Sequence, residues 1–255
     1  MSNHVKRLRI FAGPNGSGKS TLYNYLVQIK AFHSYYHINP DVIAKDLEVS
    51  LNLDNWPIDF SYDEINRFLD ASPFQSMVDF SLSELIVCQE GRIKLRDPSF
   101  GDISYLAAAL ADFLRMKMIH SCSSFSYESV FSHVSKVREL EEAKKNQFKI
   151  YLYFVATSDP SINFQRVKNR VGSGGHDVPD EKIISRYPRT MGNLYAAFKL
   201  ADRAYLFDNS TQKMNGSFNF FAEKNGKRIN LSNRFSVPRW YVDHVLKYYI
   251  EDSTA

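Results

Sequence analysis

The residues best suited to chemistry form a glycine-rich run near the start of the chain. Residues 13–20 read Gly-Pro-Asn-Gly-Ser-Gly-Lys-Ser and match the pattern G-x-x-x-x-G-K-[ST]. The glycines let backbone N–H groups point at a phosphate, Lys19 can reach the β- and γ-phosphates, and the Ser20 hydroxyl can ligate Mg²⁺. A turn without a ligand has no need of Lys followed by Ser, so we predict a nucleotide-binding loop. Its residues are Gly13, Pro14, Asn15, Gly16, Ser17, Gly18, Lys19, Ser20 and Thr21.

Two carboxylates follow later expected strands. Asp41 lies in an Asn39-Pro40-Asp41 turn at the end of a short strand. The carboxyl ends of strands line the ligand crevice of an open parallel sheet, so Asp41 can act as the base that accepts a proton from an attacking hydroxyl. Its alternative is a helix cap, and we favour the base. Glu128 ends another strand and is predicted to hold Mg²⁺ or orient a substrate, with a surface carboxylate as its alternative.

Two basic stripes flank a glycine-rich loop at residues 172–176. The stripes are Arg166 with Arg170 on one expected helix, and Lys182, Arg186 and Arg189 on the next. Their helical spacing puts each set on one face. We expect a lid whose cations neutralise a transferring phosphoryl group, and a solvated basic face is the alternative.

Strands and helices alternate around these residues. Strands are expected at residues 7–12, 35–38, 125–128, 149–155 and 204–207. Helices are expected from residues 19 and 41, near 134–143, and over 160–171 and 180–200, with Pro188 kinking or ending the last one. The strand at 149–155 is apolar on both faces, as a central parallel strand requires. This order predicts an α/β fold with a mainly parallel sheet.

The expected core, residues 5–48 and 104–210, is interrupted and extended by two further segments. Residues 49–103 are predicted to be a helical insertion, with one helix running from Ser72-Pro73 to a stop at Gly91. A further helix is marked by apolar residues from Ile103 to Phe113. Residues 211–255 should hold a hairpin and a last helix near 242–250.

Composition limits the classes of protein that this chain can belong to. Its 255 residues are 44% hydrophobic, which suits a single large domain with a buried core. A net charge of +4 is too small to indicate a nucleic-acid partner, so that class is disfavoured. No apolar stretch reaches the about 20 residues needed to span a bilayer, and no signal-peptide core follows Met1. Two cysteines without metal-ligand spacing suit a reduced, cytoplasmic setting.

Taken together, these motifs resemble the zeta toxin family of P-loop kinases. The resemblance covers residues 7–48 and about 104–210, and rests on 12–21, 38–41, 127–132, 174–179, 182–183, 186–187, 189, 193–194, 201–205 and 207–210. It implies a three-layer P-loop fold and ATP- and Mg²⁺-dependent phosphorylation of a sugar-nucleotide hydroxyl, such as that of UDP-N-acetylglucosamine. It also implies a toxin with an antitoxin protein as partner.

The resemblance assigns a role to each matching residue. Lys19 corresponds to the phosphate lysine, Asp41 to the substrate-activating aspartate, Glu128 to the acidic residue after the third strand, and Arg170 to the first lid arginine. Where some members have a second lid arginine this chain has His176, so His176 or Arg186 is expected to take that role.

Several other functions share the nucleotide-binding loop. A transporter-type ATPase is disfavoured because the chain has no Leu-Ser-Gly-Gly-Gln motif and no apolar strand ending in Asp-Glu. A kinase for another acceptor, such as a nucleoside, an antibiotic or a polynucleotide end, stays open. So does an ATP-binding switch that transfers nothing.

Overall fold

The computed structural model divides into two compact units. The first unit comprises Met1–Tyr35 and Glu128–Ala255, and the second comprises Tyr36–Tyr127. Among the described residues, no helix combines the length and the hydropathy that a membrane crossing requires. The structure describes residues 5–33, 36–89, 91–121, 123–172, 178–211, 218–232 and 237–254.

The first unit is built on a sheet with β7 (Lys149–Ala156) at its centre. β7 pairs in parallel with β1 (Arg7–Ala12) on one side and with β8 (Arg203–Asp208) on the other. β9 (Asn219–Asn225) and β10 (Arg228–Leu231) continue the sheet beyond β8 in antiparallel directions. The apolar run of β7 is therefore buried at the centre of a mainly parallel sheet, as predicted from its sequence.

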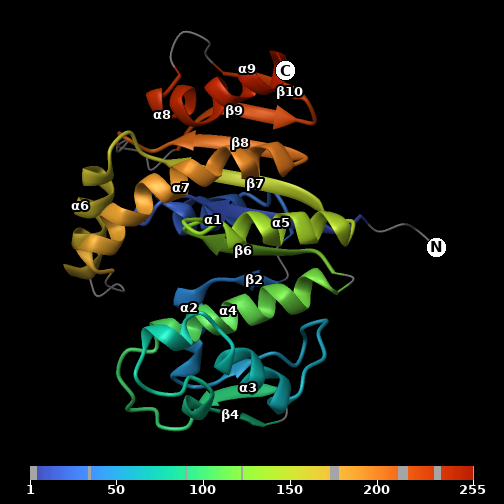
Figure 1. Cartoon of the computed structure of the whole chain (residues 1–255), viewed down its shortest axis with the longest axis vertical. Helices are drawn as coiled ribbons and strands as arrows, with labels where there is room; N and C mark the ends of the chain where they lie inside the picture. The colour runs from blue at the N-terminus through green and yellow to red at the C-terminus, as the bar shows by residue number, and fades with distance from the viewer. Residues whose placement is uncertain are drawn as a thin grey trace. The chain divides into compact units, whose positions relative to one another are not determined.

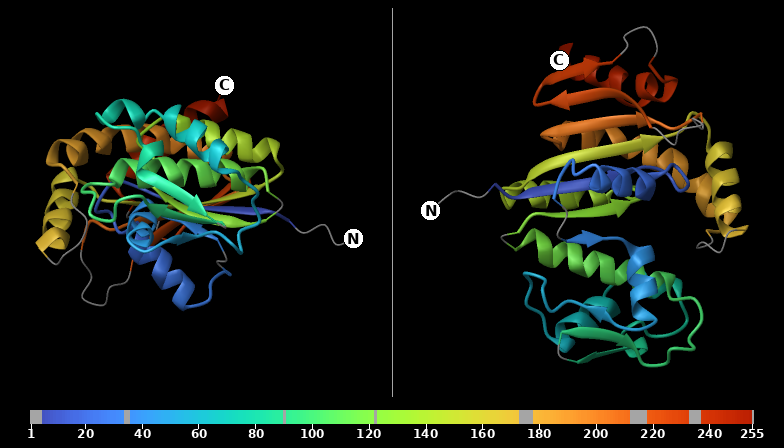
Figure 2. Two further views of the ribbon diagram at one scale, coloured as in Figure 1. Left: turned by 90° about the horizontal axis from the view of Figure 1, so that it is seen from below. Right: turned by 180° about the vertical axis from the view of Figure 1, so that it is seen from behind.

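Helices cover both faces of this sheet. Figure 2 shows α1 (Lys19–Gln28) on one face and α5 (Ser135–Lys145) with α7 (Asp180–Leu200) on the other. α6 (Pro160–Gly172) lies beside α7 (Figure 1). The expected three-layer α/β arrangement is confirmed. The chain ends with α8 (Arg239–Tyr241), the π-helical turn η3 (Val242–Leu246) and α9 (Lys247–Thr254).

α7 continues without a break through Pro188, where the sequence predicted a kink or an end. Three side chains of the same helix bind the surrounding backbone. The Tyr187 hydroxyl donates to the Thr157 carbonyl at 2.6 Å, and the Thr190 hydroxyl donates to the Val130 carbonyl at 2.8 Å. The Asn193 amide donates to the Phe131 carbonyl at 3.0 Å. These bonds hold both sides of the proline in place and offset its missing N–H.

In its described residues, the second unit contains a short parallel strand pair, three α-helices and a small sheet. β2 (His37–Ile38) pairs with β6 (Phe125–Ser129), whose last two residues belong to the first unit. The helices are α2 (Pro40–Leu47), α3 (Tyr62–Asp70) and α4 (Ser104–Ile119). The small sheet is antiparallel, in the order β3 (Leu51–Asn52), β5 (Arg92–Leu95) and β4 (Ile86–Gln89).

The helix predicted from Ser72 to Gly91 is wrong, and with it the purely helical insertion. This segment forms two short 3-10 turns, η1 (Gln75–Met77) and η2 (Ser83–Leu85), followed by β4. Gly91 lies at the β4–β5 connection rather than at a helix end. In β5 the buried Ile93 and Leu95 alternate with exposed neighbours, a period of two that favours a strand.

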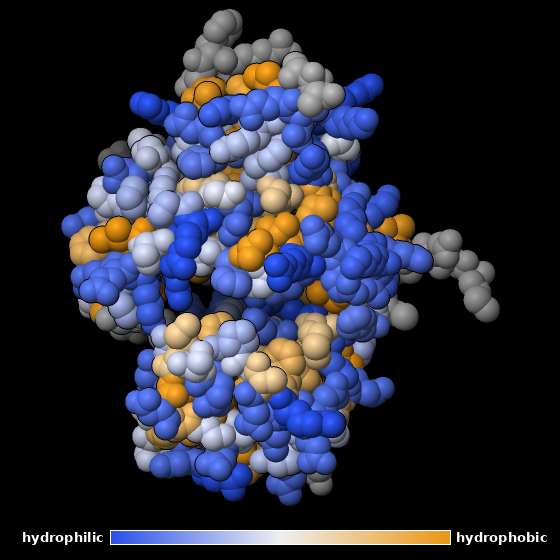
Figure 3. Space-filling view, in the orientation of Figure 1, coloured by the Kyte–Doolittle hydropathy of each residue, from blue (hydrophilic) through white to orange (hydrophobic). Residues whose placement is uncertain are grey.

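Hydrophilic side chains dominate the face of the molecule shown in Figure 3. Hydrophobic residues appear there as scattered patches, which is normal for a folded globular surface. The core includes the fully buried Leu8, Ile10, Leu152 and Phe154 from β1 and β7.

The carboxyl end of α7 provides a test of stability. Lys224 is only 6% exposed, and its ammonium donates to the carbonyls of Phe198 at 2.6 Å, Lys199 at 3.0 Å and Ala201 at 2.6 Å. We expect Lys224→Met to lower the free energy of unfolding by about 2–3 kcal/mol, because three carbonyls lose their donor. Urea unfolding measures this, with Lys227→Met at an exposed residue as control. Equal stability of the two variants would contradict the capping role.

Candidate active site

The glycine-rich loop of residues 13–18 connects the end of β1 to the start of α1, where the sequence placed it. Gly13 has a φ of +146°, and a Cβ atom there would lie 2.0 Å from the Val155 carbonyl oxygen. Only glycine allows the loop to turn so close to β7. The turn brings the loop to the start of α1, so that its backbone and the positive end of the helix lie together.

Lys19 is the first residue of α1, and its side chain folds back over the loop. Its Nζ donates to the Gly13 and Pro14 carbonyls, each at 3.0 Å. These bonds place a positive charge directly above the loop backbone. The charge and the helix end together attract an anion.

Ser20 and Glu128 meet beside this loop although 108 residues separate them in the sequence. The Ser20 hydroxyl donates to Glu128 Oε2 at 2.6 Å, and Glu128 is only 7% exposed. The pair presents a hydroxyl and a carboxylate, both of which are oxygen ligands that Mg²⁺ prefers. The sequence predicted both residues as metal ligands, and that role stays a prediction.

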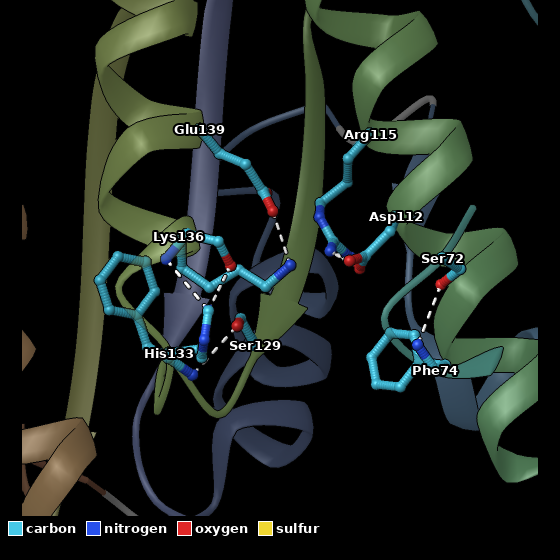
Figure 4. Close-up of polar contacts among 10 residues, drawn as sticks. Ser72, Phe74, Asp112, Arg115, Ser129, His133, Lys136 and Glu139 are labelled. Carbon is cyan, nitrogen blue, oxygen red and sulfur yellow. Dashed lines mark hydrogen bonds and ion pairs between the residues drawn. The ribbon is translucent and has the colours of Figure 1, made fainter. Parts of the chain in front are cut away.

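The turn after β6 holds Glu128 in place. The Ser129 carbonyl accepts the Gly13 N–H at 3.3 Å, which ties this turn to the loop. The Ser129 hydroxyl accepts the Phe131 N–H at 3.0 Å, and Figure 4 shows the Ser129 side chain at the end of β6. Phe131 itself has a φ of 61°, which is uncommon for a bulky residue. The bonds from Thr190 and Asn193 of α7 to the carbonyls of this turn stabilise that conformation.

α6 packs directly against the loop at Gly16. A Cβ atom on Gly16 would lie 2.5 Å from the Asn163 carbonyl oxygen and 3.2 Å from Val167 Cγ2. Asn163, Val167 and Arg170 follow the i, i+4, i+7 spacing of one helix face, and Arg166 falls at i+3. The face of α6 that contacts the loop therefore also carries both arginines.

Buried polar atoms without a hydrogen-bond partner concentrate at this contact. Four of the ten such atoms among the described residues belong to the loop or to α6. They are Asn15 Oδ1, Ser17 Oγ, Asn163 Nδ2 and Arg166 Nη1. Native proteins leave few buried polar groups unsatisfied, so these four atoms are available to bind water or a polar ligand.

Arg166 belongs to the first basic stripe, but the sequence gives it no family role, so alanine at this residue is expected from the sequence to cost little. It matched no family residue that we assigned, whereas the structure places it partly buried against the loop side of α6. Burial lowers the pKa of its guanidinium, and the Asp208 carboxylate acts in the opposite direction. Asp208 also accepts hydrogen bonds from the Ser210 hydroxyl at 2.6 Å and from the Trp240 indole at 3.1 Å. In the sequence, only the i,i+4 spacing of Arg166 and Arg170 indicated that the two arginines share one face of the helix.

Tyr187 anchors α7 close to the same acidic group. Burial raises the pKa of its phenol to about 12, and the Asp159 and Asp208 carboxylates add to that rise. The hydroxyl therefore stays protonated near neutral pH and keeps donating to the Thr157 carbonyl. Thr157 in turn donates from its hydroxyl to Asn163 Oδ1, so α6 and α7 are anchored at the same strand end.

The other predicted site residues lie on separate elements. Asp41 belongs to the second unit, in the first turn of α2, where its N–H donates to Asn39 Oδ1 at 2.9 Å. Asn39 is thus the helix cap, and the alternative capping role for Asp41 is wrong. Arg170 is exposed at the end of α6, and Arg186 is partly buried on α7. His176 lies outside the described residues.

The contact between Gly16 and α6 predicts a selective effect of added volume. Gly16 and Gly226 both have positive φ values, but nothing lies within 4 Å of a Cβ on Gly226. We expect Gly226→Ala to cost about 1 kcal/mol of stability through backbone strain alone. Gly16→Ala should cost at least about 1 kcal/mol more, because its methyl group meets the α6 backbone. Thermal unfolding measures both, and equal losses would argue against this contact.

Comparisons with known proteins were made for sequence and for structure. No known family model matches the chain. Over 63 residues the chain is 35% identical to an uncharacterised protein of Haemophilus influenzae, and this match covers 25% of the chain and 45% of that protein.

Solved structures resemble the whole chain more broadly. A crystal structure of AvrRxo1-ORF1 with AvrRxo1-ORF2 and ATP has a TM-score of 0.52 at 14% identity, covering 91% of this chain and 62% of that chain. The PezAT chromosomal toxin–antitoxin system of Streptococcus pneumoniae has a TM-score of 0.48 at 11% identity, covering 100% of this chain and 86% of that chain. The chain therefore spans less than two thirds of the AvrRxo1 chain, with which it shares its fold.

Proposed function

We propose that this chain is an ATP-dependent phosphotransferase that transfers the γ-phosphoryl group to an alcohol hydroxyl. The observation that carries the proposal is the contact of Ser20 with buried Glu128 beside Lys19, at the junction of a glycine-rich loop and a helix. The loop and its lysine suit the phosphates of ATP, and the two oxygen side chains suit Mg²⁺. The ATP in the AvrRxo1-ORF1 complex, which has the same fold, supports this choice of nucleotide.

Each residue near the loop has a part in this reaction. Lys19 would neutralise the β- and γ-phosphates, while the backbone of residues 13–18 binds them through its N–H groups. Ser20 and Glu128 would hold Mg²⁺, which supplies positive charge at the phosphate oxygens. Magnesium keeps several waters of its own, so two protein ligands are sufficient for it.

The arginines of α6 and α7 would stabilise the charge that develops during transfer. Arg166 has a buried guanidinium nitrogen without a partner, on the helix face that contacts the loop. We assign it this role together with Arg170, Arg186 and His176. A fixed cation in a partly buried site stabilises the transition state more strongly than one in water.

Asp41 is proposed as the base that takes the proton from the attacking hydroxyl. The acceptor that the zeta toxin resemblance favours is a sugar nucleotide such as UDP-N-acetylglucosamine. The test is incubation of the pure protein with labelled ATP and a panel of sugar nucleotides, nucleosides and oligonucleotides, read by mass spectrometry. A phosphorylated sugar nucleotide supports the proposal. ATP binding with no phosphorylated product would favour the switch that transfers nothing.

We further propose that the chain acts as a toxin in the cytoplasm and that an antitoxin protein blocks it. This proposal rests on the same resemblance, and the partner protein in the AvrRxo1-ORF1 complex supports it. Expression of the chain should arrest growth, and Lys19→Ala should relieve that arrest. Equal growth arrest by the unmodified chain and by Lys19→Ala would show that toxicity does not depend on the nucleotide-binding loop.

The base and the phosphate lysine should be separable by mutation. Lys19→Ala should abolish both ATP binding and transfer, because the phosphates lose their cation. Asp41→Asn should leave the Kd for ATP unchanged and lower kcat by about 10²-fold or more, as expected for loss of a general base. Calorimetric titration and a steady-state assay measure the two effects. Near-normal turnover by Asp41→Asn would remove the base role.

The arginines should act mainly on kcat. Arg166→Ala, Arg170→Ala and Arg186→Ala should each lower kcat by about 10²-fold with a smaller effect on KM, because their interactions strengthen in the transition state. Arg228→Ala is the control, since Arg228 is an exposed arginine on β10, outside both basic stripes. Equal losses of kcat in all four variants would show that the two basic stripes act only as a general basic surface.

A further inference from the structure

Beyond the phosphate-binding residues, two residues from the segment after β8 lie against the last glycine of the loop. A Cβ atom on Gly18 would lie 2.8 Å from Asn209 Nδ2 and 3.2 Å from Phe218 Cε1. The second ring atom of Phe218, Cζ, would be 3.7 Å away. Because Gly18 is the N-cap residue of α1, the Phe218 ring lies beside the helix end that attracts phosphate.

Asn209 fixes this segment to the loop. Its side-chain amide donates to the Ser17 carbonyl at 2.8 Å, and its backbone N–H donates to the Ala156 carbonyl at 2.8 Å. These two bonds join the end of β8 to the loop and to the end of β7. Asn209 and Phe218 therefore both lie against Gly18, and Asn209 is also hydrogen-bonded to the loop backbone.

The Phe218 ring is held firmly without being buried completely. It packs edge-on against Phe207, with ring centroids 6.1 Å apart and planes at 79°. It borders the buried cluster formed by Phe11, Leu22, Tyr153, Val155 and Phe207. The ring is nevertheless partly exposed, so it combines a fixed orientation with an accessible apolar surface.

We propose that Phe218 forms a wall of a nucleobase subsite, on which the base of a nucleoside triphosphate stacks. The inference rests on the proposed function, because it needs the phosphates to bind at residues 13–19. A triphosphate held there must continue into its ribose and base, and Phe218 is an aromatic surface at the helix end of the loop. Stacking of a base on an aromatic side chain contributes about 1–3 kcal/mol, and every base offers a face for it.

The alternative role for Phe218 is packing alone. A packing residue supports the loop whatever the ligand, so its loss would weaken the binding of a bare phosphate chain as much as that of a nucleotide. A stacking residue affects only ligands that have a base. Inorganic tripolyphosphate has the phosphates and lacks the base, so it distinguishes the two roles.

The experiment is a calorimetric titration of ATP and of inorganic tripolyphosphate, each with Mg²⁺, into the full chain and its variants. Phe218→Leu keeps an apolar side chain and removes the ring. We expect a Kd at least about 10-fold weaker for ATP, equal to about 1.4 kcal/mol, and a change below about 2-fold for tripolyphosphate. Phe220→Leu is the matched control, because Phe220 also packs on Phe207, at 5.4 Å, and is 41% exposed.

Other outcomes overturn the assignment. Equal weakening of both ligands by Phe218→Leu, or no weakening of ATP, would make Phe218 a packing residue only. The unmodified protein gives a second test that needs no variant, since it should bind ATP at least about 10-fold more tightly than tripolyphosphate. Equal affinities would refute the subsite while leaving phosphate binding intact. Binding of neither ligand would overturn the proposed function itself.

Discussion

The close approach of the loop backbone to its neighbours is the constraint on which the rest of the site depends. At Gly13 the loop comes so near the Val155 carbonyl that a side-chain carbon would lie 2.0 Å from it. At Gly16 a side-chain carbon would lie 2.5 Å from the Asn163 carbonyl oxygen of α6. Any side chain at these residues would separate β7, the loop and α6. Their tight packing brings the lysine, the Ser20–Glu128 pair and the arginine-bearing helix face to one place.

This packing also explains why polar atoms are left unsatisfied there. Asn163 is fully buried, and only its Oδ1 has a bond, from Thr157. Ser17 is fully buried as well, with an unpartnered hydroxyl. A structure that needed only stability would replace such groups with apolar ones, because each unsatisfied group costs about 1–3 kcal/mol. Their retention beside a charged lysine is consistent with a site selected for binding.

α7 connects the two sides of this site. Its Tyr187 binds the strand end that precedes α6, while Thr190 and Asn193 bind the turn that follows Glu128. The same helix carries Arg186 and packs on α6 through Ile183, Val167 and Val178. A shift of α7 would therefore move the acidic residue and the basic residues together. One helix thus fixes the relative placement of groups that come from three parts of the chain.

Local sequence by itself determined the helices and strands whose residue pattern fits only one type of secondary structure. Residues 7–12 are a short run that ends at Gly13, and residues 149–155 are an apolar run; both form the expected strands. Residues 180–200 form the expected helix. The glycine-rich loop was also predicted correctly, because an ordinary turn does not need glycines followed by Lys and Ser. Residues 72–91 were misread, since apolar residues spaced for a helix also fit a strand reached through short turns, and pairing with β5 decided the outcome. Pro188 does not end the helix, because bonds to Thr157, Val130 and Phe131 hold the helix on both sides of it.

Only the tertiary structure decided which distant groups meet. Nothing local shows that Ser20 will bond to Glu128 across 108 residues, or that Phe218 will lie against Gly18. The sequence showed the spacing of Arg166 and Arg170 but not that Arg166 is the one partly buried against the loop side of α6. Propensity and periodicity act over a few residues, whereas burial, pKa and hydrogen-bond satisfaction depend on what the folded chain brings into contact.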